Sequence, residues 1–148
     1  MPVTLWVSGS MGGATSLNAM VHGVAPPPCW YGVKPAVALT DMEEVPGGPE
    51  NIAEAFDGPV PTDRNPIENV DLLPLETRYR VVSSVDDQWV IYDENSGRLI
   101  EELSARQADL SVLVATGPHE DPLATTVLGS HRRPGARQLV YSALGQPI

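Results

Sequence analysis

This sequence of 148 residues has little of several residue types, and each scarcity excludes a class of protein. A single cysteine, Cys29, excludes an internal disulfide and a zinc site of four cysteines within one chain. No run of about 18 apolar residues occurs, and the first residues lack the basic and apolar regions of a signal peptide, so we expect no membrane span and no membrane partner. Only 9 basic residues stand against 19 acidic ones, which argues against nucleic acid as a direct partner.

The remaining composition fits one globular domain over residues 1–148, with 42% hydrophobic residues. Charge is uneven along the chain. Residues 41–76 contain ten acids and one basic residue, Arg64, whereas residues 122–148 contain three arginines and no acid. This asymmetry favours contact between copies and predicts a homo-oligomer, although solvated faces of an ordinary soluble domain would also explain it.

Prolines dominate the middle of the sequence, with ten of them between residues 25 and 74. Proline removes a backbone donor and biases the preceding residue away from helical angles. Residues 25–76 are therefore predicted to form an extended, irregular, acidic arm that lies against a partner. Only one or two short helices are expected in the chain, over residues 16–24 and 50–56.

The segment that follows, residues 77–144, is predicted to be a β-meander core. Strands are expected over residues 78–85, 88–93, 98–103 and 110–115, separated by turn residues such as those at 94–97. Alternation places apolar side chains on both faces of the strand around Trp89 and Val90, which predicts cover on both sides. The expected fold class is mainly β, a sandwich or small barrel-like meander.

A glycine-rich loop from Gly9 to Ser16 has the outline of a phosphate cradle at a helix start. Ala14 stands where a P-loop needs lysine, so a flexible or tight turn is the favoured interpretation. The loop also lacks a full Gly-x-Ser-x-Gly elbow, because Gly9-Ser10 continues as Met11-Gly12, and no serine hydrolase is predicted.

Other reactive groups give weaker patterns. His119-Glu120-Asp121 could hold a divalent metal, but flanking prolines favour an exposed turn. The pair Asp86-Asp87 fits a solvated turn, and Cys29 fits an inert thiol. We therefore predict no catalytic residue, no cofactor and no metal site.

Binding residues are predicted instead. The basic loop over residues 131–137 carries Arg132, Arg133 and Arg137, and its favoured use is contact with an acidic protein surface. An exposed hairpin tip and nucleic-acid contact remain the alternatives for this loop. Three aromatic residues are expected to anchor interaction patches: Trp6, Trp30 and Tyr31.

Residues 72–81, LLPLETRYRV, resemble the sequence that enters a late strand in fibronectin type III domains, and are similar to β-domains of small tail proteins of actinobacterial phages. The resemblance implies a non-enzymatic component of a virion (tail, connector or capsid-associated), located in the particle or the cytoplasm, with other virion proteins as partners. An acidic inhibitor that mimics DNA is the first alternative. A small enzyme using the loop between Gly9 and Ser16 is the second.

Overall fold

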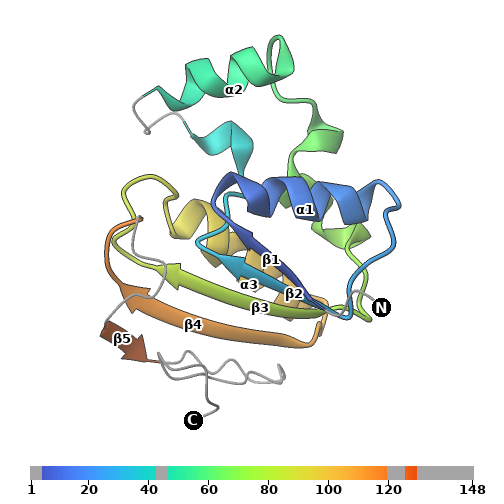
Figure 1. The fold of residues 1–148 in the computed structure, drawn as a ribbon, viewed down its shortest axis with the longest axis vertical. Coiled ribbons are helices and arrows are strands. Elements are labelled where there is room, and N and C mark those ends of the chain that lie inside the picture. The colour runs from blue at the N-terminus through green and yellow to red at the C-terminus, as the bar shows by residue number, and fades with distance from the viewer. Residues whose placement is uncertain (1–4, 43–46, 120–125, 130–148) are drawn as a thin grey trace.

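The computed structural model describes residues 5–42, 47–119 and 126–129, and its centre is one mostly parallel β-sheet (Figure 1). Four strands lie side by side in chain order and run parallel: β1 (Trp6–Gly9), β2 (Cys29–Val33), β3 (Arg78–Ser84) and β4 (Leu110–Thr116). A fifth strand, β5 (Thr126–Gly129), pairs with β4 in the antiparallel direction. Since parallel neighbours need a crossover connection, helical segments fill the chain between the strands.

The longer described helices are α1 (Met11–Val21), α2 (Gly48–Phe56), α3 (Arg98–Ala105) and a 3-10 helix over Pro66–Leu72. Single 3-10 turns lie over Leu39–Asp41 and Thr62–Arg64. Side chains from α1, α3 and the 3-10 helix pack against one face of the sheet. The strand residues that they contact alternate along each strand, as residues on one face of a sheet do. The main members of this core are Leu17, Met20, Trp30, Ile67, Val70, Tyr79, Val81, Leu99, Leu103, Leu110 and Val112. Helix α2 lies beyond α1, away from the sheet (Figure 1). Its Ile52 packs there with Ala14 of α1 and with Leu39.

The expectation of a mainly β sandwich or meander is wrong, because the sheet is parallel and crossed by helices. The segment expected as a strand over residues 98–103 belongs to α3. Its fully buried side chains, Leu99 and Leu103, are four residues apart, which is the spacing of one helical face. The segment 88–93 is a turn that leads into a π-helical turn over Asp93–Gly97.

Residues 25–76, expected to form an arm, contain β2, which is an inner strand between β1 and β3. The irregular backbone after β2 finds its hydrogen-bond partners within the chain. The Oδ1 atom of Asn95 accepts the N–H groups of Val37 and Ala38 at 2.8 and 2.9 Å, and Oδ1 of Asn65 accepts the N–H of Leu39 at 2.9 Å. Buried asparagines thus satisfy the backbone that we expected a partner to satisfy.

Candidate active site

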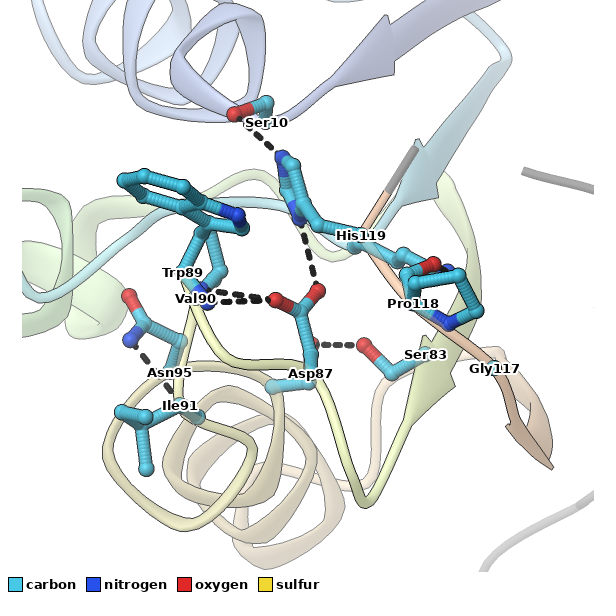
Figure 2. Close-up of polar contacts among 12 residues, drawn as sticks. Ser10, Ser83, Asp87, Trp89, Val90, Ile91, Asn95, Gly117, Pro118 and His119 are labelled. Carbon is cyan, nitrogen blue, oxygen red and sulfur yellow. Dashed lines mark hydrogen bonds and ion pairs between the residues drawn. The ribbon is translucent and has the colours of Figure 1, made fainter. Parts of the chain in front are cut away.

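Ser10 forms the turn between the end of β1 and the start of α1, at the carboxyl edge of the sheet (Figure 2). Its backbone has φ 47° and ψ −127°, a conformation that non-glycine residues rarely adopt. Hydrogen bonds on both sides hold it there. The Ser10 N–H donates to the carbonyl of Val33 at 3.2 Å, and its own carbonyl accepts the N–H of Ala36 at 2.9 Å. Such a strained residue persists only when its surroundings fix it, and strain of this kind clusters at active sites.

Close packing beneath the turn depends on Gly13. A Cβ atom built on Gly13 would lie 2.5 Å from Cβ of Pro35, so any side chain here would push α1 away from the segment that follows β2. Gly12, by contrast, has no heavy atom within 4 Å of its built Cβ. The second of these two neighbouring glycines therefore sets how closely the Ser10 turn approaches the end of β2.

Asp87 follows β3 and is 5% exposed. Its Oδ1 atom accepts two backbone N–H groups, from Trp89 and Val90, each at 2.9 Å. This local turn fixes the carboxylate and leaves Oδ2 to accept a further hydrogen bond. A buried carboxylate with this many donors contradicts the expectation that the Asp86-Asp87 pair is simply a solvated turn.

His119 follows β4 and stands between Asp87 and Ser10 (Figure 2). Its Nδ1 atom lies 2.7 Å from Oδ2 of Asp87, and its Nε2 atom lies 3.0 Å from Oγ of Ser10. An ionised carboxylate can only accept a hydrogen bond, so Nδ1 carries the ring hydrogen in this arrangement. Nε2 is then the acceptor for the hydroxyl hydrogen of Ser10.

The arrangement has the geometry of a Ser-His-Asp triad, in which the imidazole takes the serine proton and the carboxylate orients the imidazole. Both ring nitrogens of His119 form hydrogen bonds in this arrangement, so neither is left to bind a metal ion together with Glu120 and Asp121. Glu120 and Asp121 lie outside the described residues. No group of three or more metal-ligating side chains occurs within residues 5–42, 47–119 and 126–129.

Three solved structures with a similar fold are hydrolases. One is a puromycin-hydrolysing peptidase of Mycobacterium tuberculosis, with a TM-score of 0.61 and 19% identity over 78% of this chain and 18% of that one. Another is a carboxylesterase from Lactobacillus plantarum, with a TM-score of 0.60 and 17% identity over 88% of this chain and 50% of that one. A third is an α/β hydrolase from a deep-sea metagenome library, with a TM-score of 0.57 and 16% identity over 82% of this chain and 42% of that one.

At these identities the likeness shows a shared fold, and the chain spans only 18% to 50% of the length of these three structures. No family model matches the sequence, and no curated protein matches it. The neighbours overturn the resemblance to phage tail proteins and the expectation of a non-enzymatic virion component. Of the three readings of the sequence, they favour the small enzyme that uses the loop between Gly9 and Ser16.

Ser10, Asp87 and His119 were each noted in the sequence, but none was expected to be catalytic. In α/β hydrolases the nucleophile sits in a Gly-x-Ser-x-Gly turn between a strand and a helix, and the triad follows in the order Ser, Asp, His. Here the turn reads Ser8-Gly9-Ser10-Met11-Gly12, so only its first glycine is replaced, and Asp87 and His119 follow in that order. A strand followed by Ser-x-Ser-x-Gly and a helix was the available signal.

Of the residues predicted to bind partners, the structure describes Trp6, Trp30 and Tyr31, which lie on the neighbouring strands β1 and β2. Trp30 is fully buried in the core, where the centroid of its ring lies 6.2 Å from the ring centroid of Tyr79. Trp6 and Tyr31 are partly buried, and their role as anchors stays a prediction. The three arginines of the basic loop, Arg132, Arg133 and Arg137, lie outside the described residues. Within the part of the chain that the structure describes, no helix has the length and apolar character needed to cross a bilayer.

Proposed function

We propose that this chain carries the catalytic triad of a serine hydrolase that cleaves a carboxylic ester or amide by acyl transfer to Ser10. The observation that supports this proposal most is the continuous hydrogen-bonded line from Ser10 through His119 to Asp87, with lengths of 3.0 and 2.7 Å. The backbone strain at Ser10 and the hydrolase neighbours support it independently.

In the first step, Oγ of Ser10 attacks the carbonyl carbon of the substrate while Nε2 of His119 takes the hydroxyl proton. The imidazolium that forms lies 2.7 Å from the carboxylate of Asp87, which stabilises the positive charge and holds the ring orientation. The proton on Nε2 then passes to the leaving alcohol or amine, and the acyl group remains on Ser10.

Negative charge develops on the carbonyl oxygen during the attack. Met11 follows the nucleophile and is the first residue of α1, so its N–H lies in the helix turn whose N–H groups have no intrahelical acceptor. In α/β hydrolases the N–H of the residue after the nucleophile is one donor of the oxyanion hole. The positive end of the α1 dipole adds to the stabilisation of that charge.

In the second step, water replaces the leaving group. His119 takes a proton from this water, the resulting hydroxide attacks the acyl carbon, and the proton returns to Oγ of Ser10 as the acid departs. The same three side chains therefore serve both halves of the reaction, and no group beyond water is consumed.

A fluorophosphonate probe tests this proposal, because it phosphonylates a serine activated as a nucleophile much faster than an ordinary serine. We expect intact-protein mass spectrometry of the full chain to show one added phosphonyl group, located by peptide mapping at Ser10. Ser10→Ala should abolish the addition. Ser104→Ala, a serine of α3 remote from the triad, should leave it unchanged.

Hydrolysis of p-nitrophenyl acetate by the same proteins gives a second readout. The wild-type chain should release p-nitrophenol faster than Ser10→Ala at equal concentration. A folded wild-type chain that the probe leaves unmodified, or that reacts at a residue other than Ser10, would rule out the proposed function.

A further inference from the structure

Lys34 is only 2% exposed, which is unusual for a lysine. Burial of an ammonium group is costly unless hydrogen bonds compensate, so a buried lysine needs a structural or chemical reason. The residue directly follows β2, at the carboxyl edge of the sheet where the triad lies.

The backbone of Lys34 is also in an unfavourable conformation. Its φ of 45° is in the left-handed region, which glycine adopts without cost but lysine does not. The Lys34 N–H donates to the carbonyl of Val82 in β3 at 2.6 Å, which holds this conformation. A residue with a strained backbone and a buried charged side chain at this edge of the sheet is a candidate for a functional role.

The segment around Lys34 is fastened to the nucleophile. Val33, on one side, accepts the N–H of Ser10, and Ala36, on the other side, donates to the carbonyl of Ser10. Between them, Pro35 is the residue that packs directly on Gly13 of α1. Movement of Lys34 relative to Ser10 is therefore limited at both ends of a four-residue segment.

The side chain of Lys34 reaches the loop that carries the base. Its Nζ atom donates to the carbonyl of Pro118, the residue before His119. The preceding residue, Gly117, donates its N–H to Oδ1 of Asp86 at 2.8 Å. Consecutive residues of this loop, Gly117, Pro118 and His119, are thus each held by a different partner; Figure 2 shows the three in sequence.

We propose that Lys34 is a positioning residue for His119. Its side chain ties the loop over residues 117–119 to the segment over residues 33–36, which holds Ser10 on both sides. This inference rests on the proposed function, since it concerns the alignment of that nucleophile and base. A displacement of about 1 Å in reacting groups can lower a rate by about a hundredfold. Loss of the Lys34 contact should therefore lower the rate of reaction at Ser10 and leave the affinity for the probe unchanged.

The test is the rate of fluorophosphonate labelling of the full chain as a function of probe concentration. Lys34→Met keeps the length and apolar stem of the side chain and removes the ammonium group. We expect its maximal labelling rate to fall about tenfold to a hundredfold, with the half-saturating probe concentration unchanged. Lys34→Arg, which keeps a cationic donor, should recover part of that rate.

Thermal unfolding separates positioning from a structural role. Removal of the buried ammonium group relieves its desolvation cost, and water can take its place at the carbonyl of the exposed Pro118, so Lys34→Met should melt near the wild-type temperature while it labels slowly. Arg106→Met is the matched control, because Arg106 also donates to a backbone carbonyl, that of Val70, away from the triad. It should label at the wild-type rate.

The outcomes distinguish the two proposals. A wild-type chain that is not labelled at Ser10 would overturn the proposed function and this inference together. A labelled wild-type chain with Lys34→Met reacting at the same maximal rate, or losing rate only in proportion to unfolded protein, would overturn the role of Lys34 and leave the triad standing.

Discussion

The hydroxyl of Ser8 donates to Oγ of Ser16 at 2.8 Å, beneath the turn that carries Ser10. Ser16 donates in turn to the carbonyl of Gly13 at 3.1 Å and accepts the indole N–H of Trp30 at 2.8 Å. Ser8 occupies the position of the first glycine in the Gly-x-Ser-x-Gly pattern. A small hydroxyl side chain is accommodated at this buried position because a neighbouring hydroxyl accepts its hydrogen bond.

Ser8→Gly is therefore expected to retain the reactivity of Ser10. The change removes one hydrogen bond, worth about 1 kcal/mol of stability, but introduces no larger group under the turn. Ser8→Leu should lower the labelling rate and cost about 1 to 3 kcal/mol by overpacking. Fluorophosphonate labelling and urea unfolding of both variants measure these effects. A folded Ser8→Gly chain without reactivity would mean that the Ser8 hydroxyl itself takes part in the reaction.

Asp87→Asn should lower the labelling rate by about 10⁴-fold, by analogy with the same change in a serine protease triad. The NH₂ group of the asparagine would donate to Nδ1 of His119, where the carboxylate now accepts. The ring hydrogen would then lie on Nε2, which could no longer take the proton of Ser10. The hydrogen bonds from Trp89 and Val90 can still go to the side-chain oxygen, so the turn should keep its shape. Labelling kinetics and circular dichroism together measure the two effects.

The neighbouring aspartate provides the control for this prediction. Asp86 accepts the N–H of Gly117 at 2.8 Å through Oδ1, and an asparagine oxygen can accept the same bond. Asp86→Asn should thus stay within a few-fold of the wild-type rate. Equal losses in the Asp86 and Asp87 variants would contradict the assignment of Asp87 as the residue that orients the base.

Parts of the fold follow from the sequence, and the triad does not. The strand around Val112 was expected from its continuous apolar run, and the strand around Tyr79 from the turn at Asp86-Asp87 that follows it. Helix α3 was expected to be a strand, since side chains four residues apart, such as Leu99 and Leu103, share one face of a helix and one face of a strand alike. In the triad, His119 contacts Ser10, which is 109 positions away in the sequence, and Asp87, which is 32 positions away. Their meeting depends on the parallel order of the strands, which places successive carboxyl ends at one edge.

Gly13→Ala should destabilise the protein, because the added Cβ would lie 2.5 Å from Cβ of Pro35. Overpacking of this kind costs about 1 to 3 kcal/mol and should displace the Ser10 turn, with slower labelling as a result. Gly12→Ala is the matched control in the same helix, with no heavy atom near its built Cβ. It should be neutral or stabilising by up to about 1 kcal/mol. Equal urea midpoints for the two variants would show that α1 is not closely packed at Gly13.

Asn95→Ala tests how the irregular segment after β2 is held. The change removes the acceptor of two buried N–H groups, on Val37 and Ala38, and should cost about 2 to 5 kcal/mol in the free energy of unfolding. Asn69→Ala removes donors to the carbonyls of Thr62 and Asn65 and should cost only about 1 kcal/mol, because Asn69 is partly exposed. Urea unfolding should separate the two variants clearly. Similar costs would mean that the segment is held by contacts other than Asn95.

The outer edge of β1 is the feature of the described sheet that we expect to drive self-association. β1 pairs with β2 on one side, and no described strand pairs with its other side, while Val7 and Leu5 are 66% and 47% exposed. Such an edge is a template for another strand, and a charged side chain on it opposes pairing. Val7→Lys should therefore raise the monomer fraction in light scattering after size exclusion. Leu72→Lys, at a residue 57% exposed on the 3-10 helix, should not. Equal effects of both changes, or a wild-type chain that is monomeric at every concentration, would contradict association through β1.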